Sequence, residues 1–291
     1  MSTSKNDLPS PATTPAPSLQ KQQRALKWIC AGLGCLIFGG IAYSQPLGRE
    51  AGVHLLGLAG PPAIPWLLSA FEDSSAHVQK AAYDEISGLG PPAVPNLLAE
   101  LNRSKASTRI NAAGMLRLRA LHAGSEAKIR DGLLKLLEDN DRLVKLAAMN
   151  SLASLGPAAS AALPALTGYL DDIDAKMRVG AMYAVVSIDR DSPETLSIVL
   201  KMLKDSQPKV RKVACSALED IGTRDPHAIA ALIEVLHDPV PEVRMAAADY
   251  LGEIGPEGKV AIPALQDMAD NDPISDVRSK AAQSIKELSP P

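Results

Sequence analysis

A repeat with a period near 33 residues is the feature of this sequence that most constrains its fold. Similar segments recur along the chain, as in KVRKVACSALEDIG from Lys209 and EVRMAAADYLGEIG from Glu242. Their first core position falls at intervals of 30, 36, 33, 33, 33 and 34 residues, at Val78, Thr108, Val144, Met177, Val210, Val243 and Val277. A nearly constant period of this length is typical of stacked helical repeats rather than of a closed globule.

Each repeat is expected to be a pair of antiparallel helices. In the second helix apolar residues return after four, eight and eleven positions, which places them on one helical face (Val210, Ala214, Leu218, Ile221). Glycines that tolerate a left-handed turn end these helices at Gly90, Gly156, Gly222 and Gly255, and Pro91, Pro157 and Pro256 prevent continuation. A shared segment such as GPPAVPNLL places a proline in the first turn of the first helix, where no amide hydrogen bond is lost.

An acidic residue stands six positions before the basic position of the second helix in six of the seven repeats. The pairs are Asp73 with Gln79, Asp139 with Lys145, Asp172 with Arg178, Asp205 with Arg211, Asp238 with Arg244, and Asp272 with Arg278, while repeat two has Arg103 before Arg109. We expect the acid of the turn and the base of the helix to form a ladder along the stack. Because every arginine comes with an aspartate, this structural role is favoured over an anion-binding row.

These features resemble HEAT repeats, most closely the short variety first described in phycobilin-lyase-like proteins. The resemblance covers residues 61–291, about four fifths of the chain. It implies an all-α fold, a right-handed α-α superhelical solenoid of about seven helical hairpins, in which the repeated Asp and Arg are architectural. Residues 45–60 contain what looks like a lone second helix, which we expect to cap the N-terminal end of the solenoid.

The N-terminal region predicts a disordered tail and a membrane anchor. Residues 1–24 are rich in Pro, Ser and Thr and end in a basic cluster. Residues 25–44 are the predicted single transmembrane helix, whose uncharged part spans about 24 Å against a hydrocarbon core of roughly 30 Å. Its anchor residues are Trp28, Phe38 and Tyr43, the first and last at the two ends, where aromatic rings prefer the interface. A cleaved signal peptide and a buried soluble helix are the alternatives.

Charge gives an orientation and excludes one class of partner. The basic cluster precedes the apolar stretch, so the N-terminus is expected in the cytoplasm and the solenoid outside it, in the periplasm if the protein is bacterial, or secreted if the segment is cleaved. The chain after residue 44 carries 26 basic and 32 acidic residues, a balance that disfavours nucleic acid.

No catalytic or metal-binding motif appears in the sequence. The five histidines are isolated, and the His-Glu dipeptides through which HEAT-repeat hydroxylases bind iron are missing. We therefore predict no enzyme activity, no cofactor and no metal. The resemblance leaves one enzyme-like alternative, a lyase-like or chaperone-like assistant to a cofactor-bearing or envelope enzyme.

The second helices supply a candidate partner-binding face. In HEAT solenoids they line the concave surface, and residues two and six positions after the first core site tend to face outward there. The residues of this row that we single out are Ile110, Leu146, Asn150, Val179, Tyr183, Met245 and Asp249. An apolar centre with polar ends fits a protein-binding surface, and packing between helices is the alternative. The predicted function is a membrane-tethered scaffold or adaptor for an unnamed protein, with a structural spacer as a further alternative.

Overall fold

The computed structural model describes residues 46–118 and 124–289, and every regular element in these ranges is a helix. The chain divides into two compact units: unit 1 ends at Glu85 and unit 2 begins at Ile86, so the boundary in the sequence falls within a helix. The predicted anchor, with Trp28, Phe38 and Tyr43, lies outside the described residues. The helices, with 3-10 segments labelled η, are α2 (Pro46–Gly57), η2 (Pro61–Ala63), α3 (Ile64–Ser69), η3 (Ala70–Glu72), α4 (Ala76–Gly88), η4 (Pro91–Ala93), α5 (Val94–Glu100), α6 (Ala106–Leu116), α7 (Glu126–Leu136), α8 (Arg142–Leu155), η6 (Gly156–Ala162), α9 (Leu163–Thr167), α10 (Ala175–Ile188), α11 (Pro193–Met202), α12 (Pro208–Ile221), α13 (Pro226–Val235), α14 (Pro241–Glu253), η7 (Pro256–Ala261), α15 (Ile262–Asn271) and α16 (Ser275–Leu288).

Unit 1 contains α2, α3 and most of α4. Its core is formed by apolar side chains that are almost completely buried, among them Leu56, Ile64 and Leu67. Two polar contacts join α2 to the rest of the unit: Arg49 pairs with Asp73, and a hydrogen bond joins the His54 ring to Glu85. Helix α2, which lies within residues 45–60, is therefore attached to the rest of the unit by polar contacts as well as by packing.

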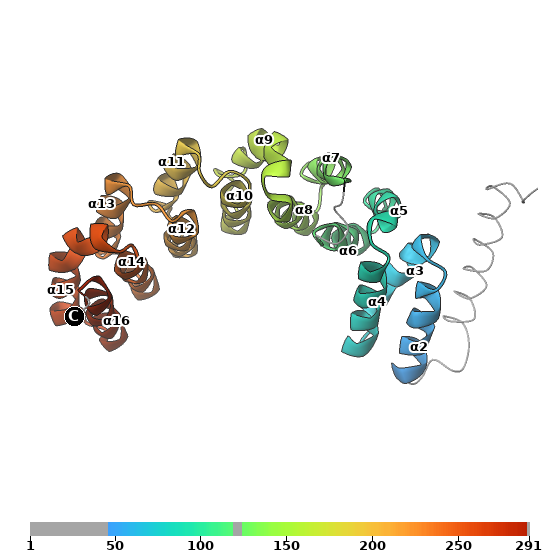
Figure 1. Ribbon diagram of the computed structural model, residues 1–291, viewed down its shortest axis with the longest axis horizontal. Coiled ribbons are helices and arrows are strands. Elements are labelled where there is room, and N and C mark those ends of the chain that lie inside the picture. The colour runs from blue at the N-terminus through green and yellow to red at the C-terminus, as the bar shows by residue number, and fades with distance from the viewer. Residues whose placement is uncertain (1–45, 119–123, 290–291) are drawn as a thin grey trace, which may run out of the picture. The chain divides into compact units, whose positions relative to one another are not determined.

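Unit 2 is a stack of helical pairs with its helices in two rows. The second helices α6, α8, α10, α12, α14 and α16 each pack against the next one along the chain. The first helices form the other row, and the second helices lie on the inner side of the curve that unit 2 follows (Figure 1). This arrangement confirms the predicted all-helical, HEAT-like solenoid for the residues of this unit.

Small aliphatic residues make the close stacking possible. Aromatic residues are 3% of the sequence, so alanine and leucine fill most core positions. Ala148, Ala181, Ala214 and Ala247, which stand four positions after the first core site of their repeats, are fully buried. Side chains this small let neighbouring helices approach at the density of a well-packed protein interior.

Glycine ends the helices through two different conformations. Gly222 is left-handed, with φ 66° and ψ 28°, as the sequence predicts. Gly60, Gly90 and Gly255 also have positive φ, but their ψ lies between −151° and −156°. The difference follows from the next residue: a proline disfavours helical ψ values in the residue before it, and Gly222 is followed by a threonine. Only glycine adopts these angles without strain.

The repeated prolines occupy helix starts, as predicted. Pro65, Pro95, Pro164 and Pro263 lie in the first turns of α3, α5, α9 and α15, each of which follows a 3-10 segment. Two first helices that follow no 3-10 segment, α11 and α13, are capped by a side chain: Ser192 accepts hydrogen bonds from backbone amides of α11, and Asp225 does so for α13.

One described helical stretch, Arg142–Thr167, is long and apolar enough to cross a membrane by length and composition alone. It consists of α8, η6 and α9, and its backbone turns at Gly156, where φ is 57°. The segment is apolar because α8 packs between α6 and α10 in the stack.

Candidate functional site

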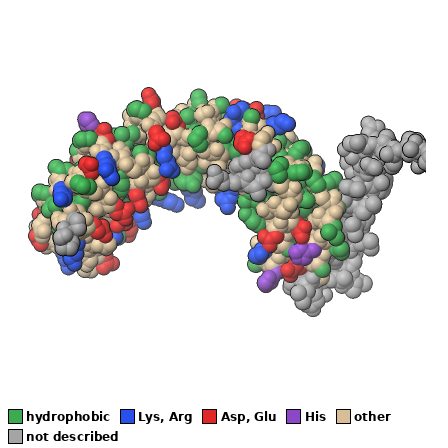
Figure 2. All heavy atoms as spheres, in the orientation of Figure 1, with side chains coloured by type: hydrophobic (Ala, Val, Ile, Leu, Met, Phe, Trp, Pro, Cys, Tyr) green, Lys and Arg blue, Asp and Glu red, His purple; other side chains and the backbone are tan. Residues whose placement is uncertain are grey.

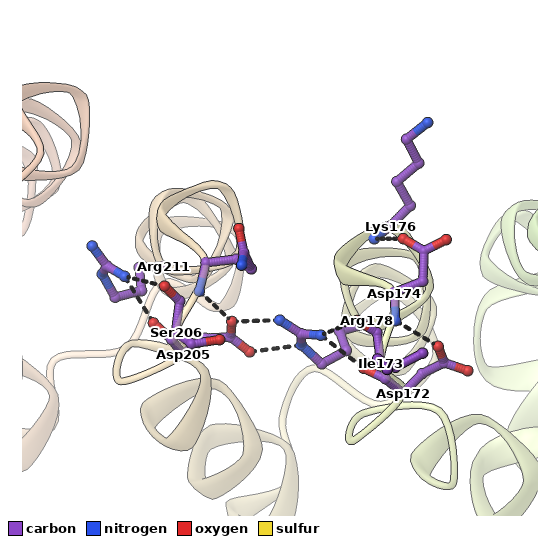
Figure 3. A network of polar contacts seen from close by, with 9 residues as sticks. Asp172, Ile173, Asp174, Lys176, Arg178, Asp205, Ser206 and Arg211 are labelled. Atoms are coloured by element: carbon purple, nitrogen blue, oxygen red, sulfur yellow. Dashed lines mark hydrogen bonds and ion pairs between the residues drawn. The ribbon is translucent and has the colours of Figure 1, made fainter.

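Bidentate Arg–Asp pairs join successive repeats. Arg178 donates from Nε and Nη2 to the two carboxylate oxygens of Asp205 at 2.7 and 2.6 Å (Figure 3). Arg211 binds Asp238 in the same way at 2.6 and 2.8 Å. The same pairing joins Arg109 to Asp139 and Arg244 to Asp272. We call these four contacts the rungs of the ladder. Each one joins a second helix to the turn of the following repeat.

The rungs correct the predicted pairing within one repeat. Six positions before each arginine, the residue offers its backbone carbonyl instead of its carboxylate: Arg178 Nη1 donates to Asp172 O at 2.7 Å, and Arg211 Nη1 donates to Asp205 O at 2.8 Å. Arg244 and Arg278 bind the carbonyls of Asp238 and Asp272 in the same way. The spacing of six therefore records a local carbonyl contact, and the aspartate carboxylate belongs to the arginine of the preceding repeat.

Two arginines missing from the predicted pairs also take part. Arg109 forms a rung although its own repeat has Arg103 in place of the aspartate. The residue six positions earlier contributes only its backbone carbonyl, which Arg103 also offers. Arg49 of α2 pairs with Asp73, with Nε 2.8 Å from the carboxylate. The sequence signal for Arg49 is its distance from the closing glycine Gly60, which equals the distance from Arg211 to Gly222.

The aspartates of the rungs are held in their charged form. Burial raises the pKa of Asp205, but the Arg178 guanidinium, the Gln207 backbone amide and the charge of Arg211 outweigh it, and the pKa lies below its ordinary value of 3.8. The same combination of a bound arginine, a backbone amide and a nearby positive charge lowers the pKa values of Asp139, Asp238 and Asp272. In turn, the hydrogen bond to Asp205 raises the pKa of Arg178. Charge-assisted bidentate bonds of this kind are among the stronger polar contacts in proteins.

One junction in unit 2 has a different contact. Lys145 occupies the arginine position of α8, but its Nζ lies 3.3 Å from the Tyr169 hydroxyl and 5.3 Å from the centre of that ring. The Tyr169 hydroxyl donates to the carbonyl oxygen of Leu137. Lys145 therefore forms no salt bridge with Asp139, its predicted partner, and Asp172 accepts a hydrogen bond from the Asp174 backbone amide (Figure 3).

The candidate partner-binding residues lie on four second helices of unit 2. Ile110 is on α6, Leu146 and Asn150 on α8, Val179 and Tyr183 on α10, and Met245 and Asp249 on α14. Asn150 and Tyr183 are exposed, and the other five are half-buried. Tyr183 keeps 50% of its surface accessible, which is the largest exposure of an apolar or aromatic side chain in this set.

Leu146 contributes to packing between α8 and α10. A Cβ atom placed on Gly180 of α10 would lie 2.9 Å from the Leu146 Cδ2 atom and 3.2 Å from the Met149 sulfur. Leu146 therefore fills the space that the glycine leaves, which is the alternative that the sequence left open for this row. Tyr183 is the residue of the set that most clearly presents a large side chain to solvent.

The part of the row nearest the C-terminus carries acidic side chains, which gather around α14 (Figure 2). Asp249 accepts a hydrogen bond from Lys280 of α16 at 2.7 Å. Burial, together with the neighbouring Glu253 carboxylate, raises the pKa of Glu219. Among the described residues, no group of His, Cys, Asp and Glu is arranged to hold a metal ion.

Burial raises the pKa of the Cys215 thiol to about 12, and the side chain is completely inaccessible. A thiol in this state is protonated at neutral pH, and Cys215 packs as a small core residue.

Comparison with known proteins identifies the repeats. A model of HEAT repeats matches residues 94–185, 174–240 and 196–286, which together cover about two thirds of the chain. No curated protein sequence matches the chain.

Solved structures share the fold at low sequence identity. Kap95p, in a complex with RanGDP, superimposes with a TM-score of 0.59 and 14% identity over 91% of this chain and 40% of its own length. YibA of Escherichia coli superimposes with a TM-score of 0.55 and 18% identity over 94% of this chain and 99% of its own length. The structure of the CpcE–CpcF complex of phycocyanin lyase from Nostoc sp. gives a TM-score of 0.42 and 18% identity, over 98% of this chain and 99% of its own length. For Kap95p and YibA, identities this low show a common fold alone.

Proposed function

The chain belongs to the HEAT-repeat family, and we propose that it is a non-catalytic scaffold that binds a protein partner on the inner row of second helices in unit 2. We propose further that residues 25–44 tether it to a membrane, with the solenoid outside the cytoplasm. Stacked helical repeats supply extended concave surfaces that are well suited to binding other proteins.

The exposed Tyr183 is the observation that carries the scaffold proposal. Tyrosine presents a large, rigid surface with a polar tip, and it is enriched at the centres of protein interfaces. Its neighbour Val179, four positions earlier on α10, is half-buried and extends the apolar area on the same helical face. Asn150 on the adjacent second helix α8 supplies an exposed polar group, and Asp249 on α14 lies further along the same row.

The tether rests on the sequence of residues 25–44 and its basic N-terminal flank. It is tested by extraction of the full chain from membranes at alkaline pH, followed by the mass of its N-terminus. An uncleaved chain that stays with the membrane is expected. A chain that begins after Ser44 would replace the tether with secretion.

The scaffold proposal is tested by site-specific photo-crosslinking of the full chain in the cells that produce it. A photoreactive residue replaces Tyr183 in one variant and Ile173 in the other. Ile173 is the matched control, because it is 90% exposed in the same repeat but lies in the turn before α10. We expect one defined adduct from position 183 and none from position 173.

The substitution Tyr183→Glu gives the second measurement. It should abolish the adducts of a photoreactive residue at the neighbouring position Asn150 and leave the thermal transition within about 2 °C, since an exposed side chain contributes little to folding. Ile173→Glu should change neither. The same adducts from positions 183 and 173, or none from either, would contradict an inner binding face and favour a structural spacer.

A further inference from the structure

Two large apolar side chains are exposed at the C-terminal end of α2: Leu55 within the helix, and Leu58 in the turn directly after its last residue. Leu55 has 50% and Leu58 has 85% of its surface accessible. Gly48 and Ala51 are also exposed, and the spacings of three, four and three residues place all four on one side of the helix. We call these four uncharged residues the α2 stripe.

The repeat register explains which side of α2 this is. With Gly60 aligned on Gly222, Leu55 takes the position of Ala217, seven residues after the first core site. The residue at this position is buried in every second helix of unit 2: Met115, Ser151, Ala184, Ala217, Tyr250 and Ser284.

This position faces the second helix of the preceding repeat. Ser151 donates from Oγ to the carbonyl of Ala113 in α6, and the Tyr250 hydroxyl donates to the carbonyl of Thr223, just after α12. In unit 1 the equivalent residue of α4 is Glu85, whose carboxylate bonds to His54 of α2. Leu55 thus points to the side on which a preceding second helix would lie.

The last helix of the solenoid treats its exposed surface differently. No large apolar side chain within α16 is exposed, and its exposed residues include Ser279, Gln283, Lys286 and Glu287. Terminal repeats of solenoids need such polar outer faces to remain soluble. The α2 stripe departs from this rule, as expected for a surface that is covered in the working protein.

We propose that the α2 stripe lies on the surface of the lipid bilayer, an inference that rests on the proposed tether. The apolar stretch of the predicted transmembrane helix ends at Tyr43, and α2 begins at Pro46. Three residues of extended chain reach about 10 Å, so α2 starts within the headgroup region if Tyr43 lies at the interface. Apolar side chains on one face of a helix at this depth insert into the boundary between headgroups and acyl chains.

Two polar neighbours of the stripe already have partners within unit 1. Arg49 pairs with Asp73, and His54 shares a hydrogen bond with Glu85. The stripe itself offers no charge to a protein partner, and lipid is the apolar phase that the tether brings to it.

The test uses the full chain reconstituted in vesicles of phosphatidylcholine and phosphatidylglycerol. Cys30 and Cys35 are replaced by alanine, the buried Cys215 stays, and Leu58→Cys receives an environment-sensitive fluorophore. The matched control is Ala282→Cys on α16, an exposed position at the other end of the chain. We expect a blue-shifted emission at position 58 and at least twofold quenching by lipids that carry a shallow spin label, with neither effect at position 282.

Three outcomes would overturn the proposal, and they are distinguishable. If the chain floats with the vesicles but position 58 emits as in water, the tether stands and the lipid contact of the stripe fails. If the fluorophore is shielded but lipids do not quench it, protein covers the stripe, either residues 28–43 of the same chain or a second copy. If the chain does not float with the vesicles, the tether and the lipid contact fail together. Circular dichroism melting of the unlabelled Leu58→Cys chain checks that the fold is intact.

Discussion

Two pairs of neighbouring second helices in unit 2 are joined by polar contacts of different chemistry. Between α10 and α12, Arg178 donates hydrogen bonds to both carboxylate oxygens of Asp205 and to the backbone carbonyl of Asp172 in its own repeat. Between α8 and α10, Lys145 reaches only the hydroxyl and ring of Tyr169. A guanidinium has five donors in a planar fork, whereas an ammonium is a compact point charge. The comparison shows that the stack accepts a different contact at this position, but that a rung needs the geometry of arginine.

The side chains of a rung are also more deeply buried than an ordinary surface ion pair. Arg211 and Asp238 keep 12% and 7% of their side-chain surfaces exposed, whereas Lys201 and Asp171 in an exposed pair keep 63% and 75%. Exposed pairs contribute little to stability, but removal of one partner from a buried pair leaves the other charge without compensation. The two kinds of junction should therefore respond very differently to substitution.

The largest expected effect is the loss of a rung arginine. Arg211→Ala leaves the Asp238 carboxylate and the Asp205 carbonyl without their donor, and we expect a loss of about 3 kcal/mol in the free energy of unfolding. Lys145→Ala should cost about 0.5 kcal/mol, because it removes a weak amine–hydroxyl contact. Urea unfolding followed by circular dichroism measures both values.

The conservative variant Arg211→Lys separates charge from geometry. It keeps the positive charge but cannot bind both oxygens of Asp238 and a carbonyl together, so a loss of about 1.5 kcal/mol is expected. Equal losses in Arg211→Ala and Lys145→Ala would show that rungs do not differ from the Lys145–Tyr169 contact.

The next effect is a pH dependence expected of the rung aspartates, whose pKa values are lowered in the folded chain. The pKa of Asp205 is lower in the folded chain than its ordinary value of 3.8, so its contribution is complete above pH 3.8 and is lost as the pH falls through the folded value. The difference in unfolding free energy between the wild type and Asp205→Asn should thus be constant from pH 7 to about 4 and shrink below.

A matched acid at the surface provides the control for this titration. Asp171 pairs with Lys201, but both side chains are mostly exposed, and Asp171→Asn should give a small difference at every pH. A difference for Asp205→Asn that already fell between pH 7 and pH 5 would assign the effect to a group other than this carboxylate.

The smallest expected effect is a gain from a rebuilt rung. The double variant Lys145→Arg, Tyr169→Val places a guanidinium opposite Asp172 and gives position 169 the residue found at the equivalent Val235. An added bidentate contact should stabilise the chain by about 1 kcal/mol, measured as an increase of a few degrees in Tm. Tyr169→Val alone should not stabilise it, because the Leu137 carbonyl loses its donor. A double variant no more stable than Tyr169→Val would show that Asp172 cannot accept a rung.

The sequence by itself determined the elements and their order. A period near 33 residues, helical apolar spacing and the Gly-Pro segments placed the second helices, their stops and the starts of several first helices. These features act over a few residues, because a helical face, a positive φ and a proline ring are local properties of the chain. The same reasoning predicts a lone second helix within residues 45–60, where α2 lies.

The tertiary structure decided which residues meet across the stack. Each rung joins residues 27 to 30 positions apart, so its partner depends on how one repeat sits on the next. The spacing of six suggested Asp172 for Arg178, whereas the carboxylate that Arg178 binds is Asp205. In the same way, Leu146 carries the apolar character of a binding residue, but the missing side chain of Gly180 on the adjacent helix makes it a packing residue. Residue types fix what a side chain can bind, and the stacking of the repeats fixes which partner it reaches.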